Sequence, residues 1–327
     1  MKKFVQENIP LIVGLACLLV VPLFIDAPYI LHIFIMTFFF AMAAVAWNIL
    51  GGLAGQFSLG HATFMALGAY GSSLMVMKLD ITPWAGMWVS GLATGILAAA
   101  LFYPCFILRG PYFSLATIAF SETFRNLFTN WAAVGKAQGM LLPIYKDAWY
   151  YMQFSGKQPY YYIGLGLLVL IYGIFVWLDR SKLGYGFKSL REDEDAASAI
   201  GVNIVRYKLA ATFISAALTA VAGAYYAQYV RYVEPDLMLV QYSVELVLPA
   251  IIGGIGTVFG PVLGSFILTP LSEYLRAAMG NKIAGAHLIL YALILVTVIR
   301  LKPEGLIGWI SVKNIYRAVN FKKLGER

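Results

Sequence analysis

Apolar runs of bilayer length recur along the whole chain and constrain its fold more than any other feature. A helix needs about 20 mainly apolar residues to cross the hydrocarbon core of a bilayer. Runs near this length fill most of the 327 residues, and the mean hydropathy of +0.76 lies far outside the range of water-soluble domains. The candidate spans are 9–25, 29–50, 61–77, 84–108, 111–129, 159–178, 209–230, 243–256, 258–278 and 285–301.

These runs predict an all-α polytopic membrane protein, a bundle of about 8–10 transmembrane helices with broken or re-entrant segments. Residues 1–327 are predicted to form a single transmembrane domain. Two spans are atypical, because 243–256 is short and 111–129 carries charged residues. Ten crossings is therefore the preferred count, and eight crossings with re-entrant pieces is the alternative. The N-terminal run follows two lysines, but no small-x-small cleavage pattern follows it, which predicts a retained first helix.

The positions of lysine and arginine predict the orientation, since these residues accumulate on the cytoplasmic side. With ten crossings and the N-terminus inside, 16 of the 24 basic residues lie in the cytoplasm. They include Arg109, the basic residues of 180–208 and a basic tail at 302–327. The sequence thus predicts a multi-pass membrane protein with both termini cytoplasmic. The excess of positive charge then reflects membrane topology and gives no reason to expect nucleic acid as a partner.

One polar segment, 179–208, interrupts this apolar chain. It holds 11 charged residues, whereas all 327 positions together hold 24 Lys and Arg and 16 Asp and Glu. Ser189 and Glu192 have the spacing of a capping box, which predicts a helix over 190–200. Gly201 stands where such a helix can end in a left-handed conformation. A solvated connector would explain the charge, but the alanines at 196 and 197 also suit a short helix that docks into a partner.

A second unusual segment combines polar side chains with glycine between two apolar runs. The polar residues are Asn48, Gln56, Ser58 and His61, and the glycines between them are Gly51, Gly52, Gly55 and Gly60. This pattern predicts a broken helix, which is tolerated at membrane depth only where protein or a water-filled path surrounds it. Two interpretations stay open: a turn at the cytoplasmic surface, or a break that lines a substrate pathway. His61 taken alone is better explained as a packed, hydrogen-bonded residue.

Charged residues inside apolar runs are few and give further candidates. Glu122 with Arg125 and Glu273 with Arg276 are i,i+3 pairs that can neutralise each other on one helix face. Glu122 and Glu245 are the carboxylates that could line a path. The glycines of 253–264 form overlapping G-x-x-x-G units, which predict close helix packing.

Motifs for catalysis and metal binding are missing from the sequence. No G-x-x-x-x-G-K-[ST] occurs, so the chain has no P-loop for ATP. No H-E-x-x-H or cysteine–histidine cluster occurs, and Cys17 and Cys105 lie in apolar runs. The sequence therefore predicts no catalytic residues, no bound metal and no cofactor, and any use of ATP requires a partner subunit.

Several stretches resemble one family, the LivM-type permease subunits of branched-chain amino acid ABC transporters. "DAASAIG" at 195–201 is similar to the E-A-A-x3-G motif that inserts into the ATP-hydrolysing subunit of such importers, with aspartate in place of the usual glutamate. The longer similar stretches are "NILGGLAGQFSLGHATFMALGAY" (48–70), "GPYFSLATIAFSETFRNL" (110–127), "REDEDAASAIGVNIVRYKLAATFISA" (191–216) and "AIIGGIGTVFGPVLGSF" (250–266).

The resemblance implies a subunit that imports leucine, isoleucine and valine, together with ABC ATPases, a second related permease and an extracytoplasmic binding protein. It also implies the ten-helix fold of the vitamin B12 importer type and a location in the cytoplasmic (inner) membrane of a prokaryote. It assigns ATPase coupling to Glu192, Glu194, Asp195, Ala196, Ala197 and Gly201. The substrate pathway is predicted at Asn48, Gln56, Ser58, His61, Glu122 and Glu245.

Two alternatives to this function stay open. The outer loop "AVGKAQGMLLP" (133–143) departs from the family pattern at Lys136, and relatives of the same architecture carry urea or short amides. A secondary transporter that works alone is the other alternative, and it would need Glu122 or Glu245 for ion coupling.

Overall fold

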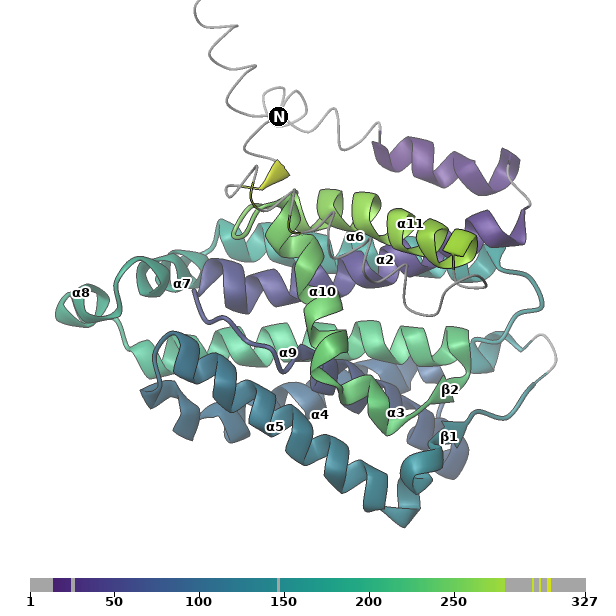
Figure 1. The fold of residues 1–327 in the computed structure, drawn as a ribbon, viewed down its shortest axis with the longest axis horizontal. Coiled ribbons are helices and arrows are strands. Elements are labelled where there is room, and N and C mark those ends of the chain that lie inside the picture. Colours follow the sequence, from purple (N-terminus) through teal and green to yellow (C-terminus); the bar gives the residue numbers. More distant parts are fainter. Residues whose placement is uncertain are drawn as a thin grey trace, which may run out of the picture.

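A computed structural model describes residues 14–24, 27–145 and 148–279, with single residues at 296, 300, 305 and 306 (Figure 1). The described part is a helical bundle with one short antiparallel strand pair. After the helix Gly14–Phe24, the α-helices are α2 Pro28–Asn48, α3 His61–Leu79, α4 Pro83–Phe102, α5 Pro111–Asn130, α6 Gln158–Asp179, α7 Lys182–Glu192, α8 Glu194–Ala199, α9 Ile204–Val230, α10 Val240–Gly253 and α11 Gly260–Met279. The strands are β1 Met140–Leu141 and β2 Tyr232–Val233, and short 3-10 turns occupy Pro104–Ile107, Ala132–Val134, Lys136–Gln138, Trp149–Tyr151 and Pro235–Met238.

The helices follow the apolar runs of the sequence. Four of them are long and apolar enough to cross a membrane by length and composition: Pro28–Leu53, Pro83–Phe102, Gln158–Asp179 and Ile204–Val230. The expected span 84–108 is wrong at its end, because Pro104 lacks an N–H and the chain turns into a 3-10 segment there. The span 285–301, except for residues 296 and 300, and the tail, except for 305 and 306, lie outside the described residues. The count of ten crossings therefore stays a prediction.

Helix α9 lies at the centre of the bundle and packs against α3 and α4 through small residues. The backbone of Gly68 in α3 faces Ala220, and that of Gly223 in α9 faces Met65, each so closely that a Cβ would clash. Gly95 of α4 meets the carbonyl of Phe213 in the same way. In a bilayer there is little hydrophobic gain from joining two helices, so close backbone contact supplies the packing energy.

The bundle has two distinct ends. Figure 1 shows α7 and α8 projecting at one end and the β1–β2 pair at the other. β1 and β2 join the chain before α6 to the chain after α9, with Met140 opposite Val233. Gly305 packs against Gly254, at the start of the loop that follows α10. Because that loop also contacts α7, the beginning of the C-terminal tail lies at the α7–α8 end.

Two helices are interrupted near this end. α2 runs on into a π-helix, Ile49–Leu53, and the chain is then irregular until His61. α10 contains Pro249 and stops at Gly253. The glycines at 253 and 264 let the backbones of α10 and α11 approach closely, which confirms that this glycine cluster serves helix packing. The predicted broken helix at 48–61 is also confirmed.

Candidate functional site

The charged segment folds into two helices and not one. Asp193 adopts an extended conformation between α7 and α8, and its carboxylate accepts hydrogen bonds from the N–H groups of Asp195 (2.8 Å) and Ala196 (3.0 Å). The expected single helix over 190–200 with Ser189 as its cap is therefore wrong. Ser189 lies inside α7, where its hydroxyl donates to the carbonyl of Gly186 at 2.8 Å. An aspartate at 193 can cap a new helix, so it competes successfully with continuation of α7.

Gly201 ends this segment as predicted. Its φ is +89°, in the left-handed region, and no atom lies near the position that a Cβ would take. Ala196 on α8 and Ile200 directly after it are exposed, and Ile200 is 79% exposed. Ala197, in contrast, is buried against the rest of the protein. Its small side chain lets α8 approach the bundle, whereas Ala196 and Ile200 remain available to another molecule.

Glu194 joins α8 to two distant parts of the bundle. Its Oε1 lies 2.7 Å from the Lys208 ammonium of α9, and the same atom accepts a hydrogen bond from the Gln56 amide at 3.0 Å. Lys208 is fully buried and also donates to the carbonyl of Phe106 at 3.3 Å. A buried ammonium is tolerated only with a countercharge, so Glu194 is a structural requirement at this position. We call Glu194, Lys208 and Gln56 the Glu194 cluster.

Asp195 makes a second contact, with Arg109 in the loop after α4, and Arg109 Nε also lies 3.9 Å from Oε2 of Glu194. The two carboxylate oxygens of Asp195 accept from Arg109 at 2.8 and 2.9 Å, a paired geometry that aligns guanidinium and carboxylate. The hydrogen bond and the charge of Arg109 lower the pKa of Asp195, and the same bond raises the pKa of Arg109. Both side chains are exposed, so water screens this pair far more than the Glu194 cluster.

Arg191 and Asn48 connect the two interrupted helices. Arg191 of α7 donates to the carbonyl of Gly52 in the π-helix at 3.0 Å, and its guanidinium lies against Gly256. The Asn48 amide donates to the carbonyl of Thr257 at 2.9 Å, and its oxygen accepts from the N–H of Gly256 at 2.8 Å. Both side chains satisfy backbone groups that the breaks leave without helical partners. α7, the first break and the second break are therefore one connected unit.

Ser58 and His61 are buried, and they bond to residues of α2 and α9. The Ser58 carbonyl accepts from the Trp47 indole at 2.8 Å. His61 Nε2 lies 2.8 Å from the Ser215 hydroxyl, which itself donates to the carbonyl of Ala46 at 2.7 Å. The expectation that His61 is a packed, hydrogen-bonded residue is confirmed.

The other two pathway candidates lie elsewhere. Glu122 of α5 pairs with Arg125 at 2.5 Å, and Arg125 reaches Asp236 at 3.3 Å. Glu245 of α10 accepts from Gln241 at 3.3 Å. In the part of the chain that the structure describes, no hydrogen bond or ion pair joins either carboxylate to the Glu194 cluster. The described hydrogen bonds and ion pairs therefore do not join the six predicted pathway residues into one network, and their role in a pathway stays a prediction.

The residues of this site that the sequence did not indicate are the basic ones that pair with its carboxylates and carbonyls. Lys208 stands at the edge of an apolar run, Arg109 is a lone charge between two apolar runs, and Arg191 belongs to the charged segment itself. An isolated basic residue at a helix end could have indicated a countercharge nearby. Nothing in the local pattern indicates which carboxylate or carbonyl it meets.

The fold and this site define an all-α polytopic membrane protein with an exposed short helix tied to two broken helices. The family model for the permease component of branched-chain amino acid transport systems matches residues 29–298. This chain belongs to that family.

Curated relatives agree with this membership. The chain is 27% identical over 264 residues to the high-affinity branched-chain amino acid permease protein LivM of Salmonella typhimurium, and equally to LivM of Escherichia coli. These matches cover 74% of this chain and 62% of each relative. The permease protein LivH of Escherichia coli is 25% identical over 295 residues, covering 81% of this chain and 92% of the relative. No solved structure has significant similarity to the chain.

Proposed function

We propose that this protein is a membrane permease subunit of an ATP-binding-cassette importer for leucine, isoleucine and valine. The observation that carries the proposal is the Glu194 cluster, which ties an exposed docking helix to the broken helix at 49–60. Family membership supports the class of solute, since the matched relatives are named as branched-chain amino acid permeases. The protein itself has no P-loop, so separate ATPase subunits supply the ATP hydrolysis.

In this mechanism, α8 docks into a groove of the ATPase. The exposed side chains at Ala196 and Ile200 face the partner, and the buried Ala197 faces the bundle. ATP binding and hydrolysis move the ATPase and carry α8 with it. Because Glu194 is bonded to Lys208 and Gln56, that motion reaches both α9 and the first break directly.

The two breaks would then move together. Arg191 holds the first break to α7, and Asn48 holds it to the second. Glycine at 52 and 256 allows these contacts, since a side chain at either place would clash with Asn48 or Arg191. The motion opens the path alternately to the two sides of the membrane, as expected for broken helices in transporters.

The assembly follows from the same proposal. A second permease subunit, related to LivH or LivM, completes the path, and an extracytoplasmic binding protein delivers the amino acid. The cytoplasmic side is the α7–α8 end, which also holds Arg109 and the beginning of the C-terminal tail at Gly305. The β1–β2 end faces the outside.

The test is to tag the C-terminus, purify the protein from its native membrane in mild detergent and identify its partners by mass spectrometry. The proposal expects a P-loop ATPase and a second apolar subunit. Reconstituted with the binding protein, this complex should take up labelled leucine only with ATP. A homomer without an ATPase, whose uptake collapses with the membrane potential, would overturn the proposal in favour of a secondary transporter.

A further inference from the structure

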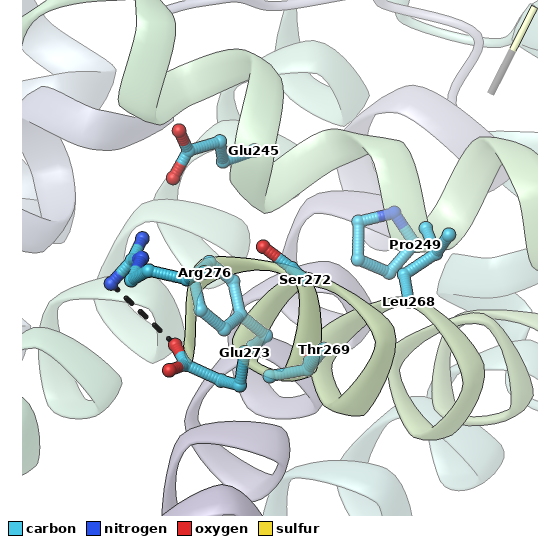
Figure 2. Close-up of a pocket in the computed structure, with 8 residues that line it drawn as sticks. Glu245, Pro249, Leu268, Thr269, Ser272, Glu273 and Arg276 are labelled. Carbon is cyan, nitrogen blue, oxygen red and sulfur yellow. Dashed lines mark ion pairs between the residues drawn. The ribbon is translucent and has the colours of Figure 1, made fainter. Parts of the chain in front are cut away.

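A small polar cavity lies between α10, α11 and α2, outside the Glu194 cluster. Its volume is about 40 Å³, and it is lined by apolar side chains and by the polar residues Glu245, Thr269, Ser272, Glu273 and Arg276. Figure 2 shows Glu245 on one side, Arg276 and Glu273 on the other, and the Ser272 hydroxyl directed toward the same space. Ionisable groups are costly in a membrane bundle, and where they occur they mark sites for solutes or ions.

The charges around this cavity are only partly matched. Glu273 is 8% exposed and pairs with Arg276, whose Nη1 lies 3.6 Å from its Oε1. This separation is too long for a hydrogen bond, so N–H groups of Arg276 remain available. Glu245 accepts from Gln241 at 3.3 Å and makes no ion pair with any residue that the structure describes. The cavity thus has two carboxylates and one guanidinium, and only Glu273 pairs with that guanidinium.

The backbone of α10 adds an acceptor beside the cavity. Pro249 lines the cavity and lies inside α10, four residues after Glu245. Proline has no N–H, so the carbonyl of Glu245 loses its usual helical donor. In transporters, backbone carbonyls freed where a helix unwinds coordinate cations. Glu245 therefore carries both a carboxylate and a carbonyl oxygen that lacks its usual helical donor.

We propose that this cavity binds the zwitterionic head group of an amino acid, its ammonium at Glu245 and its carboxylate at Arg276. An ammonium neutralises the carboxylate that has no described cation, and a carboxylate accepts the free N–H groups of Arg276. The apolar walls Phe40, Pro249 and Leu268 face the start of an aliphatic side chain. The inference rests on the proposed function for its role in import. It also separates amino acids from urea, which carries neither charge.

The position of the cavity fits the entry side of the path. The Tyr29 hydroxyl donates to the carbonyl of Glu273 at 3.3 Å, and Tyr29 lies at the beginning of α2. The other end of α2 continues into the break that meets α7 and α8. The Glu273 end of the cavity therefore lies away from the docking helix, on the side where a binding protein would release its solute.

The test measures protection of a cysteine in the cavity of the complete transporter. Ser272→Cys is introduced after replacing the native thiols (Cys17→Ser, Cys105→Ser), and its reaction with a small charged thiol reagent is timed. Leucine is expected to slow the reaction several-fold. 4-Methylpentanoate, isopentylamine and urea at the same concentration should not, because each lacks one or both charges.

Charge-removing variants test the two assigned contacts. Glu245→Gln and Arg276→Gln should each abolish protection by leucine. Glu234→Gln, which removes a carboxylate that does not line the cavity and lies next to β2, should keep it. If Ser272→Cys does not assemble, Phe40→Cys on another wall of the cavity replaces it.

The outcomes distinguish the two proposals. If leucine leaves the labelling rate unchanged in a complex that takes up leucine with ATP, the proposed binding in the cavity is overturned. The proposed function is then unaffected. Equal protection by 4-methylpentanoate would also overturn the proposed binding, since it would then not require the ammonium assigned to Glu245. Protection by leucine in a complex without ATP-driven uptake would support binding in the cavity and overturn the proposed function.

Discussion

At the scale of single residues, the Glu194 cluster and the Arg109–Asp195 pair differ in how deeply they are buried. The Glu194 side chain is 17% exposed and its partner Lys208 fully buried, whereas Arg109 and Asp195 are 62% and 74% exposed. Burial makes the first contact costly to break and leaves the second screened by water. The two contacts therefore predict different responses to mutation and to pH.

Glu194→Gln should destabilise the protein and uncouple ATP hydrolysis from uptake. The substitution leaves the buried Lys208 ammonium without its countercharge, which typically costs about 3–5 kcal/mol. Thermal unfolding of the purified complex should begin at a lower temperature, and the ratio of leucine transported to ATP hydrolysed should fall. Glu192→Gln, which changes an exposed carboxylate two positions away, is the matched control for stability.

A double variant gives the decisive comparison for this contact. Lys208→Met added to Glu194→Gln removes both charges, so most of the lost thermal stability should return. Coupling should not return, because the link from α8 to α9 is still missing. A double variant as unstable as Glu194→Gln alone would contradict the assigned pairing.

The Arg109–Asp195 pair should respond to acid only at very low pH. Because the folded-state pKa of Asp195 lies below its ordinary value of 3.8, the contribution of the pair is complete above that value. It is lost as the pH falls through the folded-state pKa. Hydrogen exchange of the α8 amides should thus show no change attributable to this pair between pH 8 and pH 5, and Arg109→Gln should speed exchange throughout that range. A step in the protection of these amides near pH 6 in the unmodified protein would contradict this.

At the scale of elements, α8 is defined by its two ends. Asp193 caps its beginning and Gly201 closes the turn after it, so six helical residues suffice to present Ala196 and Ile200. The length is set by these caps, since so short a helix has little stability of its own. Changes at the caps should therefore alter docking more than changes in the middle of α7.

Substitutions at Gly201 should show whether α8 depends on the left-handed backbone conformation of this residue. Its φ of +89° suits glycine, and open space surrounds the position of a Cβ. Gly201→Asn should keep ATPase association, whereas Gly201→Val should weaken it, because a β-branched residue at positive φ costs at least about 1–2 kcal/mol. Co-purification of the ATPase with each variant measures the difference. Equal association of the two variants would show that the turn does not position α8.

At the scale of the whole molecule, the two ends of the bundle differ in what they contain. The α7–α8 end carries the Glu194 cluster and both helix breaks, and the β1–β2 end closes the other side (Figure 1). α2 spans the distance between the cavity at Glu273 and the break at Gly52. This arrangement suits a transport path in which the solute enters on one side of the membrane and the ATPase acts on the other.

The orientation of this bundle predicts opposite labelling of two surface positions. Ile200, directly after α8, is 79% exposed, and Leu141 on β1 is 71% exposed. In a background without native cysteines, Ile200→Cys should react with an impermeant reagent only from the cytoplasm, and Leu141→Cys only from outside. Intact cells and inverted vesicles provide the two measurements. Reaction of both positions from the same side would contradict the topology.

The sequence by itself determined the bundle, most helix boundaries, the charged segment, the break after Asn48 and the family. These features depend on apolar length, local caps and glycine, which act over a few neighbouring residues and can be read in order. The tertiary structure decided that Glu194 meets Gln56 and Lys208, that Arg191 and Asn48 join the two breaks, and that Glu245 faces Arg276 across a cavity. Gln56 and Glu194 are 138 positions apart, and only packing brings them within hydrogen-bonding distance. Local pattern carries no information on such distant partners.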